Sequence, residues 1–137
     1  MIGSAEEFVR LRSSSNLIDY QRAAHDDAPD AVWLDVIQRF PDYRFWVAHN
    51  KTVPVSILQV LAEDSDERVR GMVARKRKLP SELAAVLARD SSEIVRAATA
   101  RHRNTPPEVL SALAGDPSPI VRKIAEQRRE NPKQVGQ

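Results

Sequence analysis

The chain lacks several of the residue types on which enzyme and cofactor chemistry depends. It has no cysteine, which excludes disulfides, thiolate catalysis and cysteine-ligated zinc or iron–sulfur sites. Its four glycines stand singly, so no glycine-rich loop can cradle a phosphate group. Only 5% of the residues are aromatic, which leaves few side chains for stacking on nucleic-acid bases. No Ser/His/Asp set or carboxylate pair suggests a catalytic site, and we therefore expect no enzymatic activity, metal or cofactor.

Long apolar segments are also missing. No run approaches the length of a membrane span, and residues 1–4 lack the charged-then-apolar pattern of a secretion signal. Hydrophobic residues make up 42% of the chain and charged residues 29%, which is ordinary for a folded protein. The length of 137 residues suits one domain. These properties predict a single cytoplasmic domain that does not enter a membrane.

What the chain does contain is a sequence repeat with a period of 26 residues. The dipeptide Val-Arg recurs at this spacing as Val69-Arg70, Val95-Arg96 and Val121-Arg122. Four further columns share the period: Asp64, Asp90 and Asp116; Pro54, Pro80, Pro106 and Pro132; Ala48, Ala74 and Ala100; Leu61, Leu87 and Leu113. A fixed period in this range is typical of an α-solenoid, in which each unit buries its apolar face against its neighbours.

The first part of each repeat is predicted to be a helix. Asp64 and Glu67 have the spacing of an N-cap residue and its reciprocal partner, and Asp90 with Glu93 repeats that spacing. In the next copy, Pro117 would take the first helical position. The helical stripe that follows the first of these caps consists of Val69, Met72 and Val73.

A second helix should follow at the conserved spacing of the prolines. Pro80 is expected to open it, with an apolar face made of Leu83, Val86 and Leu87. In the next copy, Thr105 would start a capping box ahead of two prolines. Because no segment alternates apolar and polar residues, the prediction is all-α.

The same frame divides the whole chain into repeats. Ser4 is expected to cap a first helix in which Phe8, Val9 and Leu11 are the packing residues. We predict one helical-repeat domain over 1–137: an N-terminal cap (1–16), a divergent repeat (17–41), three regular repeats (42–64, 65–90 and 91–116) and a partial C-terminal repeat (117–137).

The repeat resembles the leucine-rich repeat variant family, and more distantly HEAT repeats. The segment that carries the resemblance is Val95-Arg96 to Ala100, then Thr105 to Leu110, then Leu113 to Asp116. The resemblance implies a right-handed superhelix of about five two-helix repeats, in which the second helix can be α or 3₁₀. Members with an N-terminal iron–sulfur cluster exist, but no cysteine here matches its ligands. Solenoids of this kind mostly bind proteins, and a few bind nucleic acid.

The charged columns separate into two groups. Arg70, Arg96 and Arg122 are expected to reach an aspartate of their own or the adjacent repeat, which is a structural role. A second column, with the same period, consists of Lys51, Arg77, Arg103 and Arg129, has no such explanation, and is extended by its neighbours. Together these residues form a predicted basic stripe: Lys51, Arg75, Lys76, Arg77, Lys78, Arg101, His102, Arg103, Arg128 and Arg129.

The basic stripe supports three interpretations. It could be a solvated set of helix ends, where cations are favoured by the helix dipole. It could bind another protein through an acidic segment, which is the leading prediction, or it could contact nucleic-acid phosphates. The charge distribution supports the two binding interpretations. Residues 1–42 carry a net charge of −4 from four arginines against eight acids, whereas residues 43–137 carry +6 from 17 cations against 11 acids.

Two less favoured sites complete the prediction. A helical-repeat DNA glycosylase would need an acid and aromatic residues in a pocket, for which Trp33, Asp42, Tyr43 and Trp46 are the candidates. The periodicity makes both tryptophans packing residues instead. The polar run from His25 to Asp30 lacks metal-ligand spacing and is expected to be a solvated turn.

Overall fold

The protein is all-α, as the sequence predicts. The computed structural model describes residues 1–131, and over this range it contains ten α-helices, one 3₁₀ helix and no strand. None of these helices is long and apolar enough to cross a membrane. The chain divides into two compact units, residues 1–63 and residues 64 onward. Pro132, the predicted start of a final second helix, lies outside the described residues.

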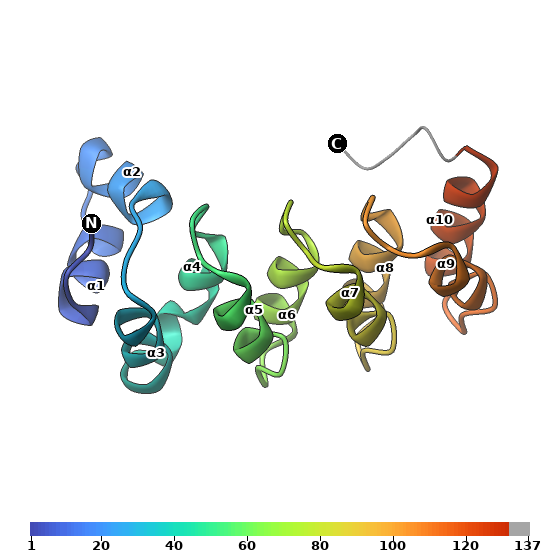
Figure 1. Cartoon of the computed structure of the whole chain (residues 1–137), viewed down its shortest axis with the longest axis horizontal. Helices are drawn as coiled ribbons and strands as arrows, with labels where there is room; N and C mark the ends of the chain where they lie inside the picture. Colours follow the sequence, from blue (N-terminus) through green and yellow to red (C-terminus); the bar gives the residue numbers. More distant parts are fainter. Residues whose placement is uncertain (132–137) are drawn as a thin grey trace. The chain divides into compact units, whose positions relative to one another are not determined.

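Unit 1 contains the first five α-helices (Figure 1). They are α1 (Ala5–Ser13), α2 (Leu17–His25), α3 (Asp30–Arg39), α4 (Arg44–His49) and α5 (Val55–Leu61), with the 3₁₀ helix η1 (Pro41–Tyr43) before α4. The predicted cap of α1 is confirmed: Ser4 Oγ accepts the Glu7 N–H at 3.0 Å. The Glu7 carboxylate accepts in return from Gly3 N–H at 2.8 Å, one residue before the cap. Phe8 and Trp33 are completely buried and meet edge to face, with ring centroids 5.2 Å apart.

Unit 2 is built from repeated helix pairs. Its helices are α6 (Glu67–Ala74), α7 (Ser81–Leu87), α8 (Glu93–Arg101), α9 (Pro107–Leu113) and α10 (Pro119–Glu130). The first helices of the pairs pack side by side, α6 on α8 and α8 on α10, and the buried valines of the Val-Arg dipeptides lie on them (Figure 1). Ala74 and Ala100 are fully buried, which allows close approach of the helices. The second helices α7 and α9 are α-helices of seven residues each.

The predicted caps of the first helices in unit 2 are wrong by two residues. The N-caps are Asp66, Ser92 and Ser118, and α10 begins at Pro119 instead of Pro117. Each predicted cap aspartate instead accepts the N–H of the true cap residue, at 2.8–2.9 Å. This is the local turn that Asp side chains form two residues ahead along the chain. The period placed an aspartate correctly in each loop but could not distinguish a turn residue from a cap residue.

Two other predictions for the second helices are wrong. The Thr105 hydroxyl does not cap α9 but donates to Thr99 O at 2.6 Å, in a buried position. The N-cap of α9 is Pro106, and its side chain forms no cap hydrogen bond. Val86, assigned to the apolar face of α7, is 61% exposed. The helix is short enough that Leu83, Ala84 and Leu87 fill its buried side.

Candidate basic edge and interhelix groove

An arginine–aspartate ladder joins the repeats of unit 2 at the N-terminal ends of their first helices. Arg70 forms a bidentate pair with Asp90, from Nε to Oδ2 at 2.8 Å and from Nη2 to Oδ1 at 3.1 Å. Arg96 repeats the pair with Asp116 at 2.8 and 3.2 Å. Each arginine also donates through Nη1 to the backbone oxygen of its own repeat's aspartate, as Arg70 does to Asp64 O at 2.7 Å. The predicted structural role is therefore confirmed for Arg70 and Arg96, whereas Arg122, among the described residues, donates only to the backbone oxygens of Asp116 and Pro117.

The ladder changes the protonation of its members. Burial alone would raise the pKa of Asp116, but hydrogen bonds from Arg96 and the Ser118 N–H, with the positive charges of Arg96 and Arg122, hold that pKa below its ordinary value. The hydrogen bond to Asp90 raises the pKa of Arg70 above its ordinary value. These pairs are only 6–15% exposed, so they are partly desolvated contacts between adjacent repeats.

A second set of contacts, here called the carbonyl ladder, joins the same repeats at the opposite ends of the first helices. His102 Nε2 lies 2.6 Å from Lys76 O, while its Nδ1 accepts the Asn104 N–H at 2.9 Å. Because Nδ1 accepts, Nε2 carries the proton and donates it to the Lys76 carbonyl. One repeat further on, Arg128 Nη1 donates to His102 O at 2.7 Å and to Ala100 O at 2.8 Å. The Asn104 amide donates to Leu79 O at 2.9 Å.

Two residues of the predicted basic stripe therefore belong to the carbonyl ladder. His102 and Arg128 are half-buried, and burial lowers the pKa of each below its ordinary value. The hydrogen bond to Lys76 O partly offsets this in His102, whereas the nearby Arg103 and Arg128 charges add to it. His102 Nε2 and Arg128 Nη1 donate to backbone carbonyls of the preceding repeat, so these contacts join repeats. The sequence period grouped His102 and Arg128 with exposed neighbours because all of these residues recur at the same helix end.

The exposed cations at this end of the repeats form the basic edge of unit 2. Its members are Arg75, Arg77, Lys78, Arg101, Arg103 and Arg129. The carbonyl ladder connects residue 76 to residue 102 and residue 102 to residue 128. The residues next to these three positions in the chain therefore lie on one side of the unit. Figure 1 shows the turns after α6 and α8 and the end of α10 along that side. Lys76 is half-buried. Lys51 is exposed on unit 1.

The charges of the basic edge are not used inside the described part of the chain. Over residues 1–131, none of its six side chains forms an ion pair or hydrogen bond, in contrast to the ladder arginines. Three of them, Arg75, Arg77 and Lys78, lie within four residues of one another. One cation per helix end is explained by the helix dipole, but adjacent like charges repel one another. The arrangement is therefore suited to an anionic surface brought from outside.

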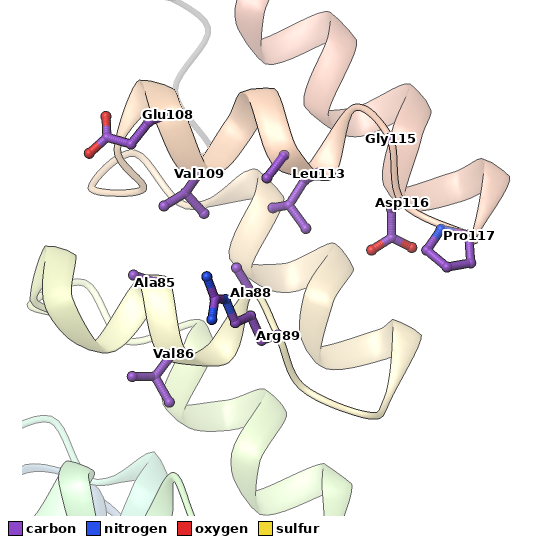
Figure 2. Close-up of a pocket in the computed structure, with 11 residues that line it drawn as sticks. Ala85, Val86, Ala88, Arg89, Glu108, Val109, Leu113, Gly115, Asp116 and Pro117 are labelled. Atoms are coloured by element: carbon purple, nitrogen blue, oxygen red, sulfur yellow. The ribbon is translucent and has the colours of Figure 1, made fainter.

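Unit 2 also contains a groove that the sequence did not reveal. It lies between α7 and α9 and has a volume of about 560 Å³ (Figure 2). Most of its lining is apolar, and three charged side chains, Arg89, Glu108 and Asp116, stand at different places along it. Positions 63, 89 and 115 are equivalent in the repeat but carry Glu, Arg and Gly. A column without a common residue gives no periodic signal, which is why sequence reasoning passed over Arg89.

The residues considered for a glycosylase pocket lie in unit 1, where Trp33, Tyr43 and Trp46 serve packing or local contacts and Asp42 is exposed. Trp33 is completely buried, and Tyr43 exchanges a 2.6 Å hydrogen bond with the Ser13 hydroxyl. The Arg12 guanidinium lies over the Trp46 ring, 3.4 Å from its centroid. Trp46 is half-buried, so its assignment to the core is only partly correct. Over residues 1–131, no three His, Asp or Glu side chains are grouped as metal ligands.

Comparison with protein families identifies one repeat of unit 2. Residues 95–118 match the family model described as leucine rich repeat variant. The resemblance to this helical repeat family is therefore confirmed. The leucine rich repeat variant segment runs from α8 through α9 to Ser118, the N-cap of α10, and so contains Arg96 of the arginine–aspartate ladder and Arg101 and Arg103 of the basic edge. No curated protein and no solved structure gives a significant match to the chain.

Proposed function

We propose that the chain is a non-enzymatic protein-binding module that engages an acidic segment of a partner along the basic edge. The observation that carries the proposal is the contrast between two sets of arginines on the same repeats. Arg70 and Arg96 are paired with aspartates, while Arg77 and Arg103 remain exposed and without a partner among the described residues. Cations that the fold does not use are available to a ligand.

The repeat architecture supports a continuous binding surface. In a right-handed superhelix of paired helices, which the leucine rich repeat variant match favours, adjacent helices lie roughly 8–10 Å apart. Cations at equivalent positions would then face a bound chain at regular intervals. An extended acidic segment can present carboxylates to several of them at once, and each contact would be a charge-assisted hydrogen bond.

The test is charge reversal on the basic edge compared with charge reversal elsewhere in unit 2. The variant is Arg77→Glu with Arg103→Glu, and the control is Arg68→Glu with Lys123→Glu, which changes the net charge equally at other exposed positions. Proximity labelling of the chain in cells should identify a partner with an acidic segment. We expect that partner to be lost with the edge variant and retained with the control. Equal labelling by both variants would contradict the proposal.

Nucleic-acid binding is a second candidate, favoured by the regular spacing of the same exposed cations. It predicts an affinity for short RNA or DNA that falls steeply with salt, with a slope reduced by about one for each cation removed. The measurement is fluorescence anisotropy with a labelled 20-nucleotide probe at 50 and 200 mM salt. Absence of binding at the lower salt concentration would dismiss this candidate and leave the protein partner. The absence of catalytic activity and the cytoplasmic location remain predictions.

A further inference from the structure

We infer that the groove between α7 and α9 is a docking site for a partner peptide that presents aliphatic side chains together with a carboxylate. This surface is separate from the basic edge and shares no residue with it. The inference therefore stands or falls independently of the acidic segment proposed above.

The groove offers apolar surface that the fold leaves open. Ala85, Val86 and Ala88 approach it from α7 and the segment after it, and Val109 and Leu113 approach it from α9 (Figure 2). Ala112 of α9 also lines it. Leu113 is buried, but Val86 is 61% exposed and Ala112 is also exposed. A volume of about 560 Å³ lies within the range of known ligand-binding pockets and is enough for several side chains of a bound peptide. Aliphatic groups laid along the groove would cover Val86 and remove apolar surface from water.

Arg89 determines which apolar ligand fits. It follows the end of α7, and its exposed side chain lines the groove, where Figure 2 draws it in front of α7. Within the described residues its guanidinium forms no ion pair or hydrogen bond. Asp116 also lines the groove, but both its oxygens are already used by Arg96, and one also accepts the Ser118 N–H. Arg89 therefore has no acid of its own.

A purely apolar ligand would be a poor occupant for this reason. It would cover the Arg89 guanidinium, which stays ionised. Removing an unpaired charge from water costs more free energy than the apolar contact gains. A carboxylate on the ligand would form a bidentate ion pair with the guanidinium and so neutralise its charge. The helix dipole accounts for a cation near the end of α7, but it does not account for one that lines an apolar groove.

The shape of the groove favours a peptide over a compact molecule. Two of its charged groups come from different helix ends, with Arg89 after α7 and Glu108 in the first turn of α9. Near its other limit lies Gly115, whose position carries no side chain to close the groove. A ligand that spans these points must be elongated. A helix that places its apolar face between two helices, with a carboxylate one turn from the aliphatic side chains, meets both requirements.

The experiment selects ligands without assuming their sequence. Random 12-residue peptides displayed on phage are selected on the immobilised full chain, and the enriched peptides are synthesised and their affinities measured. We expect enrichment of aliphatic residues spaced three or four apart, with Asp or Glu nearby. Arg89→Glu should weaken binding of these peptides by about fivefold or more, given the usual strength of a partly exposed ion pair and the added repulsion.

A second variant tests the groove without removing a charge. Ala112→Phe adds a ring inside the groove from an exposed position and should abolish detectable binding. Ser111→Phe, on the neighbouring exposed position of α9 outside the groove lining, is the matched control and should bind as the wild type does. Circular dichroism establishes that each variant is folded.

Four results would overturn the inference. Selection could yield no apolar–acidic pattern, or the enriched peptides could bind Arg89→Glu and Ala112→Phe as well as the wild type. Peptides that lose affinity only with Arg77→Glu and Arg103→Glu would support the basic edge and count against the groove. Finally, if the wild type dimerises by light scattering and Ala112→Phe is monomeric, the occupant is a second copy of the chain instead of a partner peptide.

Discussion

Unit 1 and unit 2 are made of similar short helices, yet different kinds of contact hold them together. In unit 2 the same contact recurs from repeat to repeat, as in the pairs Arg70–Asp90 and Arg96–Asp116. In unit 1 the contacts are individual. Phe8 packs on Trp33, and Arg12 covers Trp46. A repeated contact can be recognised from its spacing, whereas an individual contact cannot.

The two units also differ in how they use their cations. Residues 1–63 contain nine acids and six basic residues, whereas residues 64–137 contain ten acids and fifteen basic residues. In unit 1 several arginines are paired, as Arg22 is with Asp26 and Arg39 is with Asp35 and Glu6. In unit 2 the aspartates of the ladder are paired with the ladder arginines, and the excess cations lie exposed on the basic edge. The surplus is therefore a property that the fold of unit 2 does not require.

The largest expected effect comes from breaking the arginine–aspartate ladder. Asp116→Ala removes the bidentate partner of Arg96 and the acceptor of the Ser118 N–H, and leaves a partly buried guanidinium unpaired. We expect the free energy of unfolding to fall by about 3–5 kcal/mol, measured by urea denaturation. Asp116→Asn, which can still accept the Ser118 N–H, should lose less. A loss below about 1 kcal/mol for the alanine variant would show that the ladder contributes little to unit 2.

The corresponding change in unit 1 targets a single residue. Asn50→Ala leaves Ala23 O and Asp26 O without the donor that reaches them at 2.8 and 3.0 Å, in a completely buried position. The expected loss is about 2–3 kcal/mol, because the buried Ala23 O would lose its donor, while Asp26 O keeps the longer hydrogen bond from Thr52 Oγ1 at 3.3 Å. Thr52→Ala removes only the exposed hydroxyl that donates to Asn50 Oδ1 and Asp26 O, leaves the Asn50 amide in place, and should cost less than about 1 kcal/mol. If both variants lose the same amount, the Asn50 amide is not what joins these segments.

The sequence predicted the parts of the fold that repeat. The helix pairs, the buried valine and alanine columns, and the partnership of Arg70 and Arg96 with aspartates all follow from residues that recur every 26 positions. The caps were placed wrongly because Asp64 and Asp66 are both good turn formers, and only the backbone path decides which of them caps α6. A period locates a residue within its repeat but does not fix its local geometry.

The candidate sites were predicted less completely than the fold. The exposed cations Arg77 and Arg103 were found because they recur, but recurrence also included His102 and Arg128, whose donors turn inward to backbone carbonyls. The direction of a side chain depends on packing that the repeat pattern does not encode. The groove was missed for the opposite reason, since Arg89 has no counterpart at the equivalent positions of the other repeats.

A smaller effect is expected from pH, through the carbonyl ladder. His102 is neutral, donating from Nε2 and accepting at Nδ1, and its pKa lies below the ordinary value of 6.5. The folded state therefore binds its proton less readily than the unfolded state. The stabilisation that neutral His102 gives to the folded state is complete above about pH 6.5 and is lost as the pH falls through the lowered pKa. Arg103 and Arg128, which are close enough to oppose a charge on the ring, act in the same direction.

The measurement is urea denaturation between pH 8 and pH 5, with His102→Asn as the variant that cannot titrate. We expect the variant to be about 1–2 kcal/mol less stable than the wild type at pH 8, because hydrogen bonds to Lys76 O and from Asn104 are altered. The difference between the two proteins should shrink as the pH falls. A difference that is constant over this range would show that His102 does not titrate differently in the two states.

The smallest effect on stability is expected from changes on the basic edge. This prediction also distinguishes most clearly between arginines that stabilise the fold and arginines that are available to a partner. Arg77→Glu with Arg103→Glu should change the free energy of unfolding by no more than about 0.5 kcal/mol, since both side chains are exposed. Reversing Arg77 even removes repulsion from Arg75 and Lys78, which offsets a less favourable helix dipole. If this variant were destabilised as strongly as Asp116→Ala, the edge cations would be structural, and the distinction between the ladder and the edge would fail. A variant that unfolds like the wild type but loses its partner would instead assign the surplus charge to binding.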